Sequence, residues 1–291
     1  MNRRILVIGA TGLLGSDLVP ILKSRGFDVV APSSAELDIT NPVDCGKIPA
    51  EEFGKFDWAI NCAAYTKVDL AETEKEKAFE LNATGPSMLA KACAMSNIRL
   101  IHISTDYVFD GESTEPYTES HDTNPKSVYG ESKLEGELAV IESSPIHVVF
   151  RTSWLYGSNG PSFVKTVLRL LGSGNTVRIV NDQRGCPTST VGLSDAIASA
   201  IEIEIPSGIY HATGQTDLSW YEFAQIIKEI AGIDVAIEPI RTEDYPTAAK
   251  RPKNSVLCNR KLIELGIKID PDLGTPLKKV IENLTQSQDS A

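Results

Sequence analysis

The sequence predicts an α/β fold: a doubly wound, mostly parallel Rossmann-type sheet with a smaller C-terminal lobe. Short apolar runs alternate with amphipathic helical patterns through the first half, and a glycine-rich turn joins the first run to the first helix. Strands that are buried on both faces give such continuous runs, so helices are expected on both faces of the sheet. The 291 residues, of which 42% are hydrophobic and 23% charged, suffice for one large core without disulfides.

The elements of the first half follow one another at the spacing of βαβ units. The first helix is expected to end at Gly26, and the next strand to stop before Pro32, because proline cannot donate to the sheet ladder. Strands are predicted over residues 4–8, 28–31, 58–62, 99–104 and 147–152. Helices are predicted over residues 13–24, 72–95 and 128–142.

The pattern becomes less regular after Thr152, where a second, smaller lobe is expected. Helices are predicted over residues 162–171, 193–203 and 219–231, with two short ones at 261–265 and 276–284. Strands are predicted over residues 177–180, 208–212 and 235–239, before a polar loop to Asn254. The polar tail 286–291 is expected to fray.

Composition excludes several classes of function. The 28 basic and 39 acidic residues give a net charge of −11, which argues against a general nucleic-acid binder. The apolar run Ile5–Ile8 is too short for a signal peptide, and no run approaches the ~20 residues of a membrane span. We therefore expect a soluble, cytoplasmic monomer or homodimer whose partner is a small molecule.

Gly9, Gly12 and Gly15 join the first strand to the first helix with the spacing GxxGxxG. Gly9 permits a tight turn, Gly12 lets the backbone approach a pyrophosphate, and Gly15 lets the helix pack closely on the sheet. The amides and partial positive charge of the helix N-terminus suit phosphate. A plain strand–helix turn is the alternative. The position of the turn in the first βαβ unit favours a dinucleotide site. We therefore expect residues 1–152 to form mainly an NAD(P)-binding domain. Residues 153–291 are expected to form mainly a substrate-binding lobe, some segments of which return to the sheet.

The end of the second strand bears on the choice between NADH and NADPH. The dinucleotide signature expects an acidic residue ~20 positions after the glycines, at the ribose 2′-hydroxyl. Here the chain continues as Pro32, Ser33 and Ser34, and small hydroxyl residues do not repel a 2′-phosphate. The sequence therefore favours NADPH, with NADH also accepted. Asp38 could accept from the adenine amino group with Ile39 packed on the ring, or Asp38 could be a turn residue.

Tyr129 is the one tyrosine that has a lysine, Lys133, four residues later. This spacing places both side chains on one helix face, with Cβ atoms ~5–6 Å apart. A phenol can give its proton to a carbonyl oxygen, and a neighbouring ammonium stabilises the phenolate that remains. Thr105 ends the preceding strand, and its hydroxyl could form a second hydrogen bond to that oxygen. An exposed pair on a solvated helix is the alternative reading.

Longer motifs around these residues resemble the extended short-chain dehydrogenase/reductase superfamily, and within it the dTDP-4-dehydrorhamnose reductases. The strings STDYVFDG from Ser104 and RTSWLYG from Arg151 are far more specific than the tyrosine–lysine pair. Further matches are NCAA at 61–64, AYTKVD at 64–69, DQRGCPT at 182–188 and RPKNS at 251–255. The resemblance covers residues 5 to about 260.

This resemblance implies roles for individual residues. The catalytic residues would be Thr105, Tyr129 and Lys133. The cofactor contacts would be Gly12, Leu13, Leu14, Asp38, Ile39, Ala63, Ala64, Tyr65, Tyr129 and Lys133, in addition to the Gly9 and Gly15 of the turn. The substrate contacts would be Thr105, Asp106, Val68 and Trp154, although Trp154 could instead be a core aromatic.

Two arginines of the second half are candidates for contact with an anionic ligand. Arg184 and Arg251 are candidates to hold the phosphates of a nucleotide, and surface ion pairs are the alternative for both. Some family members bind magnesium at a dimer contact through an acidic residue just after the third glycine, where this chain has Ser16. Since the four histidines are also far apart in sequence, no metal site is expected.

The resemblance implies reduction of the C4 ketone of dTDP-4-dehydro-L-rhamnose to dTDP-L-rhamnose by NAD(P)H, with Tyr129 as the proton donor. Another nucleotide-sugar 4-ketoreductase is one alternative. A non-catalytic regulatory subunit on the same scaffold, as in the regulatory β subunit of methionine adenosyltransferase, is a second. The intact set of Thr105, Tyr129 and Lys133 argues against the regulatory reading, because a binding module needs no proton donor there.

Overall fold

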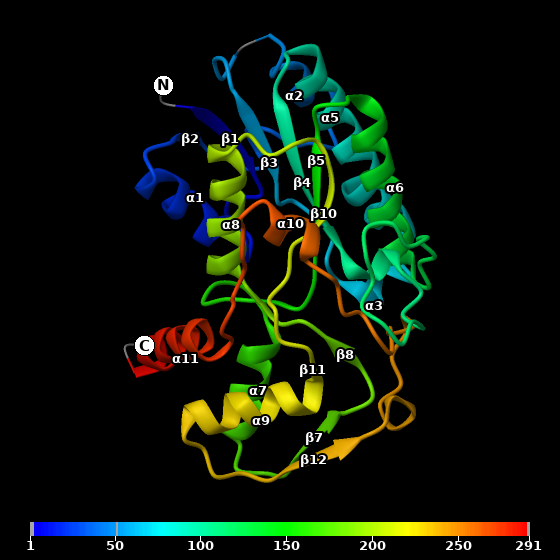
Figure 1. Ribbon diagram of the computed structural model, residues 1–291, viewed down its shortest axis with the longest axis vertical. Helices are drawn as coiled ribbons and strands as arrows, with labels where there is room; N and C mark the ends of the chain where they lie inside the picture. The colour runs from blue at the N-terminus through cyan, green and yellow to red at the C-terminus, as the bar shows by residue number, and fades with distance from the viewer. Residues whose placement is uncertain (1–2, 51, 290–291) are drawn as a thin grey trace.

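A computed structural model of the chain describes residues 3–50 and 52–289, and it divides into a sheet domain above a smaller lower lobe (Figure 1). Six parallel strands form the sheet in the order β10-β5-β4-β3-β1-β2. They are β1 (Arg4–Ile8), β2 (Asp28–Val30), β3 (Trp58–Asn61), β4 (Arg99–Thr105), β5 (Val148–Thr152) and β10 (Gly208–His211). The order reverses between β1 and β3, and ligands of such sheets bind beyond the carboxyl strand ends at this point.

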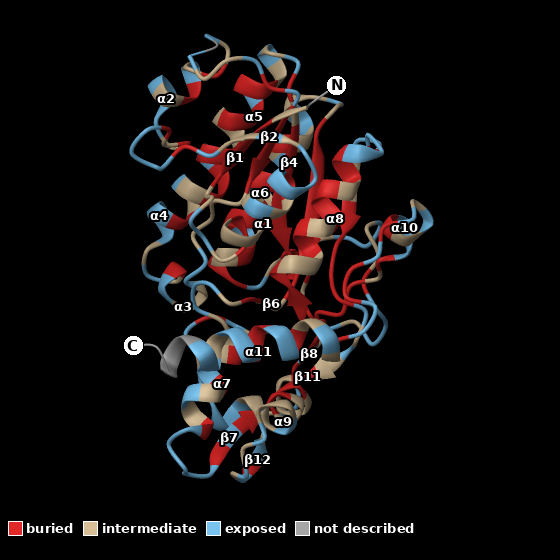
Figure 2. Ribbon diagram, turned by 90° about the vertical axis from the view of Figure 1, so that its left-hand side faces the viewer, coloured by how far each residue is buried: buried red, intermediate tan, exposed pale blue. Residues whose placement is uncertain are grey.

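Helices cover both faces of the sheet, as the continuous apolar runs predicted (Figure 1). One face carries α1 (Gly15–Ser24) and α8 (Thr190–Glu202), and the other carries α5 (Gly85–Met95) and α6 (Val128–Ser143). Side chains of β1 alternate between the two layers, because Ile5 and Val7 pack in one core cluster while Leu6 and Ile8 pack in the other. Figure 2 shows the buried sheet between helices whose outer faces are exposed.

The lower lobe has its own apolar core around Tyr156, Val167 and Phe223. Its helices are α7 (Phe163–Leu171), α9 (Trp220–Ala231) and α11 (Gly274–Asp289). Its strands pair two by two: β7 (Val177–Val180) with β12 (Ile237–Ile240), β8 (Arg184–Gly185) with β11 (Leu218–Ser219), and β6 (Leu155–Tyr156) with β9 (Thr188–Ser189). Between these segments the chain returns to the sheet domain as α8 and β10.

The structure departs from the expected elements where local signals were weak. The helix expected over 72–95 is divided into α4 (Lys75–Phe79), a π-helical turn (Glu80–Thr84) and α5, in which Pro86 lies in the first turn. The expected fraying from residue 286 is wrong as far as Asp289, because α11 continues to that residue, and residues 290–291 lie outside the described residues. Short elements that were not predicted are α2 (Pro42–Gly46), α3 (Val68–Ala71), the 3₁₀ turns Asp106–Val108 and Thr242–Asp244, and the strands β6, β8, β9 and β11. The short helix α10 (Arg260–Glu264) follows the expectation for 261–265 closely.

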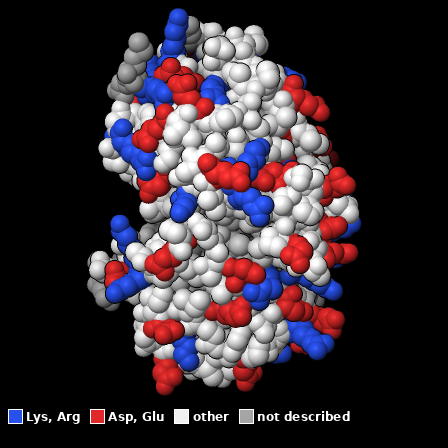
Figure 3. Space-filling model, in the orientation of Figure 1, with Lys and Arg blue, Asp and Glu red and all other residues white. Residues whose placement is uncertain are grey.

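The surface of the molecule mixes charges of both signs. Figure 3 shows acidic and basic side chains interspersed over the face that it presents, without a continuous basic patch. Among the helices of the described residues, none is both long and apolar enough to cross a membrane.

Candidate active site

The glycine turn has the close packing that its spacing predicted. Gly9 has a φ of 76°, and a Cβ added there would lie 2.6 Å from the amide nitrogen of Ala63. A Cβ on Gly15 would lie 2.3 Å from the carbonyl oxygen of Gly9, so α1 starts directly against the turn. Gly12 is exposed between them. The result is a cradle without side chains at the N-terminus of a helix, which fits the pyrophosphate of a dinucleotide.

The other residues expected at the cofactor divide into exposed and buried ones. Leu13 is half-buried, whereas Leu14 and Ile39 lie in the core with 5% and 2% of their surface exposed. Leu14 and Ile39 could therefore reach a ligand only through their backbone. The Asp38 carboxylate accepts hydrogen bonds from the amide and hydroxyl of Thr40, at 2.9 and 2.8 Å. Asp38 thus has the hydrogen bonds of a turn residue, and its adenine contact stays a prediction.

A carboxylate that sequence reasoning did not weigh lies close to the end of β2. Glu36 accepts hydrogen bonds from the amide and the hydroxyl of Ser33, each at 2.8 Å. These bonds, led by the one from the backbone, lower the pKa of Glu36. The sequence analysis expects the run 32–34 near the ribose 2′-position, and the Glu36 carboxylate is bonded to one residue of this run.

The segment Ala63–Tyr65 is held by a buried asparagine, Asn82, in the π-helical turn. The Asn82 side chain accepts from the Tyr65 amide at 2.7 Å and donates to the Tyr65 carbonyl at 3.0 Å. It also donates to the hydroxyl of Ser132 on α6 at 3.0 Å. Asn82 therefore ties the predicted cofactor-binding segment to the helix that carries the tyrosine–lysine pair.

The three predicted catalytic residues converge at the carboxyl end of β4. Thr105 is the last residue of β4, and its hydroxyl is hydrogen-bonded to the phenol of Tyr129 on α6. The Thr105 hydroxyl also donates to Asp106 at 2.9 Å. One turn further along α6, the amine of Lys133 donates to the Ile103 carbonyl at 2.6 Å. The Tyr129 hydroxyl is therefore directed at the sheet rather than at bulk water.

Close packing of α6 on the sheet domain makes this arrangement possible. A Cβ on Gly136 would lie 1.9 Å from the carbonyl oxygen of Asn82, so no larger residue fits there without moving the helix. Glu137, which has no exposed surface, forms an ion pair with Arg151 of β5, whose Nε lies 3.0 Å from Oε2. These two contacts fix the distance of α6 from the sheet and its rotation about its own axis. They therefore also fix the positions of Tyr129 and Lys133.

Burial determines the protonation of the site. It raises the pKa of the Tyr129 phenol far above its ordinary value, so the phenol keeps its proton through neutral pH. Burial lowers the pKa of Lys133 to about 8, against the opposing effects of Glu137 and Cys62. It raises the pKa of Asp106 to about 6, although hydrogen bonds from Ser255 and Thr105 act in the other direction. The site thus combines a protonated phenol with an amine that titrates near neutrality.

A groove of 1090 Å³ opens beside the catalytic residues, between the sheet domain and the lower lobe. Tyr107 lines it, and the Tyr107 ring meets the ring of Tyr129 edge-on at 5.4 Å. Arg251 also lines the groove and reaches across the lobes, donating to Asp69 at 2.5 Å and to the Tyr107 hydroxyl at 3.4 Å. Thr105, Tyr129 and Lys133 are not among the residues that line the groove, and Tyr129 adjoins it through the ring of Tyr107.

Trp154 is not among the residues that line the groove, and its substrate contact stays a prediction. It has a φ of 49°, a conformation that is unusual for a large side chain, and its ring stacks on Trp220 with centroids 3.3 Å apart. Trp220, the first residue of α9, lines the groove, while Trp154 lies behind it against Gly185. Trp220 had no signal in the sequence, because an aromatic residue at the start of an amphipathic helix is usually a core residue.

The two candidate phosphate-binding arginines have different surroundings. Arg184 is 44% exposed and forms ion pairs with Asp217 and Glu222, at 3.0 and 3.3 Å. The surface ion-pair alternative therefore describes Arg184, which is not among the residues that line the groove. Arg251 does line the groove, so it is the better placed of the two. Val68, the first residue of α3, is half-buried one position before Asp69, which lines the groove too.

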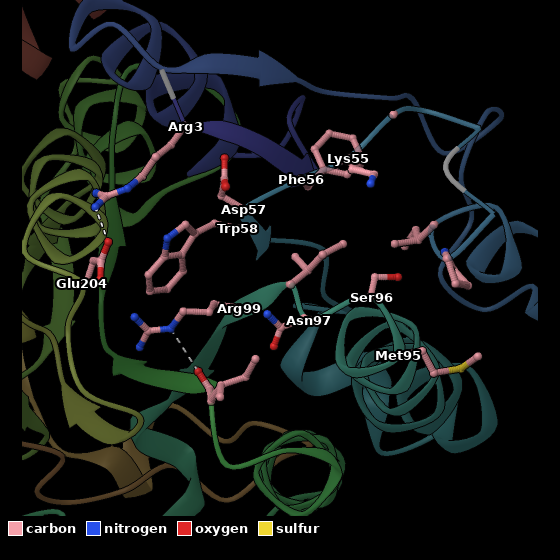
Figure 4. Close-up of a pocket in the computed structure, with 15 residues that line it drawn as sticks. Arg3, Lys55, Phe56, Asp57, Trp58, Met95, Ser96, Asn97, Arg99 and Glu204 are labelled. Atoms are coloured by element: carbon pink, nitrogen blue, oxygen red, sulfur yellow. Dashed lines mark hydrogen bonds and ion pairs between the residues drawn. The ribbon is translucent and has the colours of Figure 1, made fainter. Parts of the chain in front are cut away.

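A second cavity, of 740 Å³, lies at the amino ends of the strands, where β3 and β4 begin (Figure 4). Its cations have structural partners. The Arg99 guanidinium lies 4.1 Å from the centre of the Trp58 ring and also donates to the Ile205 carbonyl. Figure 4 shows Arg99 donating to the Ile146 carbonyl at 3.4 Å and Arg3 paired with Glu204 at 2.6 Å. Both arginines therefore bind the segment that follows α8.

Within the described residues, no cluster of three or more histidine, cysteine, aspartate or glutamate side chains could hold a metal ion. The five cysteines are all free, and Cys45, Cys93 and Cys186 are buried.

The geometry can be compared with known proteins. Residues 3–286 match the family model described as the RmlD substrate binding domain. A dTDP-4-dehydrorhamnose reductase from Streptomyces griseus is 41% identical over 260 residues, which are 87% of this chain and 85% of that protein. A probable dTDP-4,6-dihydroxy-2-methyloxan-3-one 4-ketoreductase from Streptomyces antibioticus is 40% identical over 256 residues, which are 87% and 86% of the two chains. A structure of dTDP-4-dehydrorhamnose reductase from Bacillus anthracis in complex with NADP has a TM-score of 0.90 at 35% identity, covering 99% of this chain and 100% of that one.

Proposed function

The chain belongs to the RmlD substrate-binding-domain family, and on that premise we propose that it is an NADPH-dependent dTDP-4-dehydrorhamnose reductase. It reduces the C4 ketone of dTDP-4-dehydro-L-rhamnose to the alcohol of dTDP-L-rhamnose. The observation that carries the assignment of catalytic residues is the convergence of Thr105, Tyr129 and Lys133 beside an interlobe groove. Each of these groups has a separate task in carbonyl reduction.

The glycine cradle at the start of α1 fits the dinucleotide, since a Cβ at Gly9 or Gly15 would close it. NADPH, when bound, supplies the hydride. Tyr129 gives its proton to the oxygen that was the carbonyl oxygen; a phenol is protonated at neutral pH, and burial raises its pKa further. Thr105 positions the same oxygen through its hydroxyl. Lys133, as an ammonium, stabilises the phenolate that Tyr129 becomes.

The groove supports recognition of a nucleotide sugar. Trp220, Tyr107 and Tyr245 line it, and aromatic rings of this kind pack well on a base or a sugar face. Arg251 places a guanidinium in the same groove, where it could pair with a diphosphate. Because Asp69 holds Arg251 in the structure, binding of a diphosphate would exchange one anionic partner for another.

A substrate panel tests the proposal. We expect the purified protein to consume NADPH in the presence of dTDP-4-dehydro-L-rhamnose, with dTDP-L-rhamnose as the product identified by mass spectrometry and NMR. The 40% identical ketoreductase makes another 4-keto dTDP-sugar the second candidate. Turnover restricted to such a sugar would replace the first assignment with the second, and absence of turnover with every 4-keto nucleotide sugar would contradict both.

A further inference from the structure

A line of buried polar groups leads from Lys133 into the sheet. Asn61 ends β3 and His102 lies within β4, and the parallel register pairs the two residues. Neither has any exposed surface. Residues that are paired across neighbouring strands project to the same face, which here is the face covered by α6. Burying hydrophobic residues in this layer would cost less free energy than burying polar ones, so the two polar side chains need an explanation.

The hydrogen bonds assign the proton on the His102 ring. The Ala63 amide donates to Oδ1 of Asn61 at 3.1 Å, which leaves the Asn61 NH₂ group directed at His102. Nδ2 of Asn61 lies 3.2 Å from Nδ1 of His102, so Nδ1 must accept. Burial, together with the charge of Lys133, lowers the pKa of His102 well below its ordinary value, and the ring is neutral. A neutral imidazole that accepts at Nδ1 carries its proton on Nε2.

That proton faces Lys133. Nε2 of His102 lies 3.4 Å from Nζ of Lys133. An ammonium group has three donors and no acceptor, whereas the neutral amine has one lone pair that can accept from Nε2–H. We propose that His102 and Asn61 are positioning residues that favour the amine of Lys133 over the ammonium and so lower the proton affinity of Lys133. Their part in catalysis rests on the function proposed above, since it acts through Lys133.

The opposite arrangement carries a cost. Nε2 could accept from an ammonium only if the ring proton moved to Nδ1, where it would face the NH₂ group of Asn61. The Asn61 amide could turn over to accept that proton, but its NH₂ group would then face the Ala63 amide. A buried donor would be left without an acceptor, which is unfavourable because the donor has lost its hydrogen bond to water. The proton affinity of Lys133 is therefore coupled to the backbone at Ala63, one of the predicted cofactor contacts.

Other groups around Lys133 favour its ammonium form, in contrast to His102. Glu137 on α6 favours the ammonium, although Arg151 of β5 pairs with Glu137. The thiol of Cys62, after β3, also favours the ammonium. Tyr129 lies one turn before Lys133 on α6. Because His102 is the group from β4 that opposes the ammonium by a directed hydrogen bond, its removal should raise the pKa of Lys133.

The direct test is the tautomer of His102 in the intact protein. A long-range ¹H–¹⁵N correlation spectrum of ¹⁵N-histidine-labelled protein should show His102 protonated on Nε2. His147 supplies an internal reference, since Leu100 donates to its Nδ1 at 3.3 Å and its Nε2 lies 3.1 Å from the Ala90 carbonyl oxygen. Protonation of His102 on Nδ1 would overturn the proposal, and this readout needs no enzymatic activity.

Two variants extend the test to Lys133, whose pKa is followed through its ¹³Cε resonance. His102→Asn keeps a partner for Asn61 but removes the N–H that faces Lys133, so we expect the pKa to rise by about one unit. Asn61→Asp should move the proton of His102 to Nδ1, visible in the same ¹⁵N spectrum, and should also raise the pKa. His147→Asn is the matched control and should leave it unchanged. An unchanged Lys133 pKa in folded His102→Asn protein would contradict the proposal.

The two proposals can fail separately. If the protein reduces no nucleotide sugar, the tautomer and the pKa of Lys133 still decide the hydrogen-bond assignment. If reduction occurs, turnover should decline as pH rises through the Lys133 pKa of about 8, because the ammonium is then lost. In His102→Asn this decline should move to higher pH by about one unit, which loss of packing alone would not produce.

Discussion

The polar groups of the sheet domain and those of the lower lobe are held in different ways. Glu137 and Arg151 pair where at most 3% of either side chain is exposed, and Asn61, His102 and Lys133 form a buried line. In and around the lower lobe, Arg184 pairs with two carboxylates at an exposed site, and Arg251 and Asp69 pair at the edge of the groove. One region holds its groups without solvent, and the other offers groups whose partners can be exchanged.

The difference corresponds to the two tasks of the enzyme. Proton transfer needs groups that are fixed to within fractions of an ångström, and burial with complete hydrogen bonding provides this. Recognition of a nucleotide sugar needs side chains that leave one partner for another, and half-exposed ion pairs can do so at small cost. The comparison predicts large effects for changes in the sheet domain and smaller ones at the groove and at exposed sites.

The largest effect is expected from Tyr129→Phe, which removes the phenol proton and leaves the ring in place. Turnover with dTDP-4-dehydro-L-rhamnose should fall by ~10²–10⁴, the usual contribution of a positioned acid. Binding of NADPH, followed by fluorescence titration, should change little, because the cradle of α1 is untouched. Turnover within a factor of two of the unmodified enzyme would remove Tyr129 from the mechanism.

Arg151→Met should reduce the free energy of unfolding by ~3–5 kcal/mol, because it leaves the Glu137 carboxylate buried without its partner. Urea denaturation followed by circular dichroism measures the change. Arg184→Met is the matched control, since it removes an exposed arginine from two ion pairs and should cost less than ~1 kcal/mol. Equal losses in the two variants would show that the contrast between the regions is wrong.

Arg251→Ala should act on binding more than on chemistry. We expect KM for the nucleotide sugar to rise about tenfold or more, since one charged hydrogen bond contributes ~1.5–3 kcal/mol, while kcat changes by less than about threefold. Steady-state kinetics at saturating NADPH gives both values. Arg184→Met should leave KM unchanged, because Arg184 is not among the groove-lining residues. A higher KM in the Arg184 variant alone would reassign the phosphate contact.

The smallest effect is expected at the exposed rim of the sheet domain. Glu36→Gln removes a negative charge beside Ser33, where a 2′-phosphate is expected, and keeps the side-chain length. The ratio of kcat/KM for NADPH to that for NADH should rise about two- to fivefold, because exposed charges are largely screened. A ratio that falls instead would show that Glu36 does not face the 2′-position.

The predicted pattern of elements was accurate where one local signal was sufficient. The strand Arg4–Ile8 has the expected bounds, and α1 ends at Ser24 before Gly26. The helical stretch expected from about 72 to 95 is helical over 75–95, and only the π-helical turn Glu80–Thr84, where Asn82 packs against α6, had no signal in the sequence. The short strands of the lower lobe had no local signature, since two-residue pairings depend on segments that are distant in sequence.

The sequence by itself determined the glycine cradle, the tyrosine–lysine pair and Thr105, because each follows from spacing along one or two adjacent elements. It also determined the family, through strings of residues that occur together. The tertiary structure alone decided that Trp220 rather than Trp154 lines the groove, that Arg251 lines it while Arg184 does not, and that His102 faces Lys133. The physical reason is that side-chain partners across strands and lobes depend on register and packing, which no local pattern encodes.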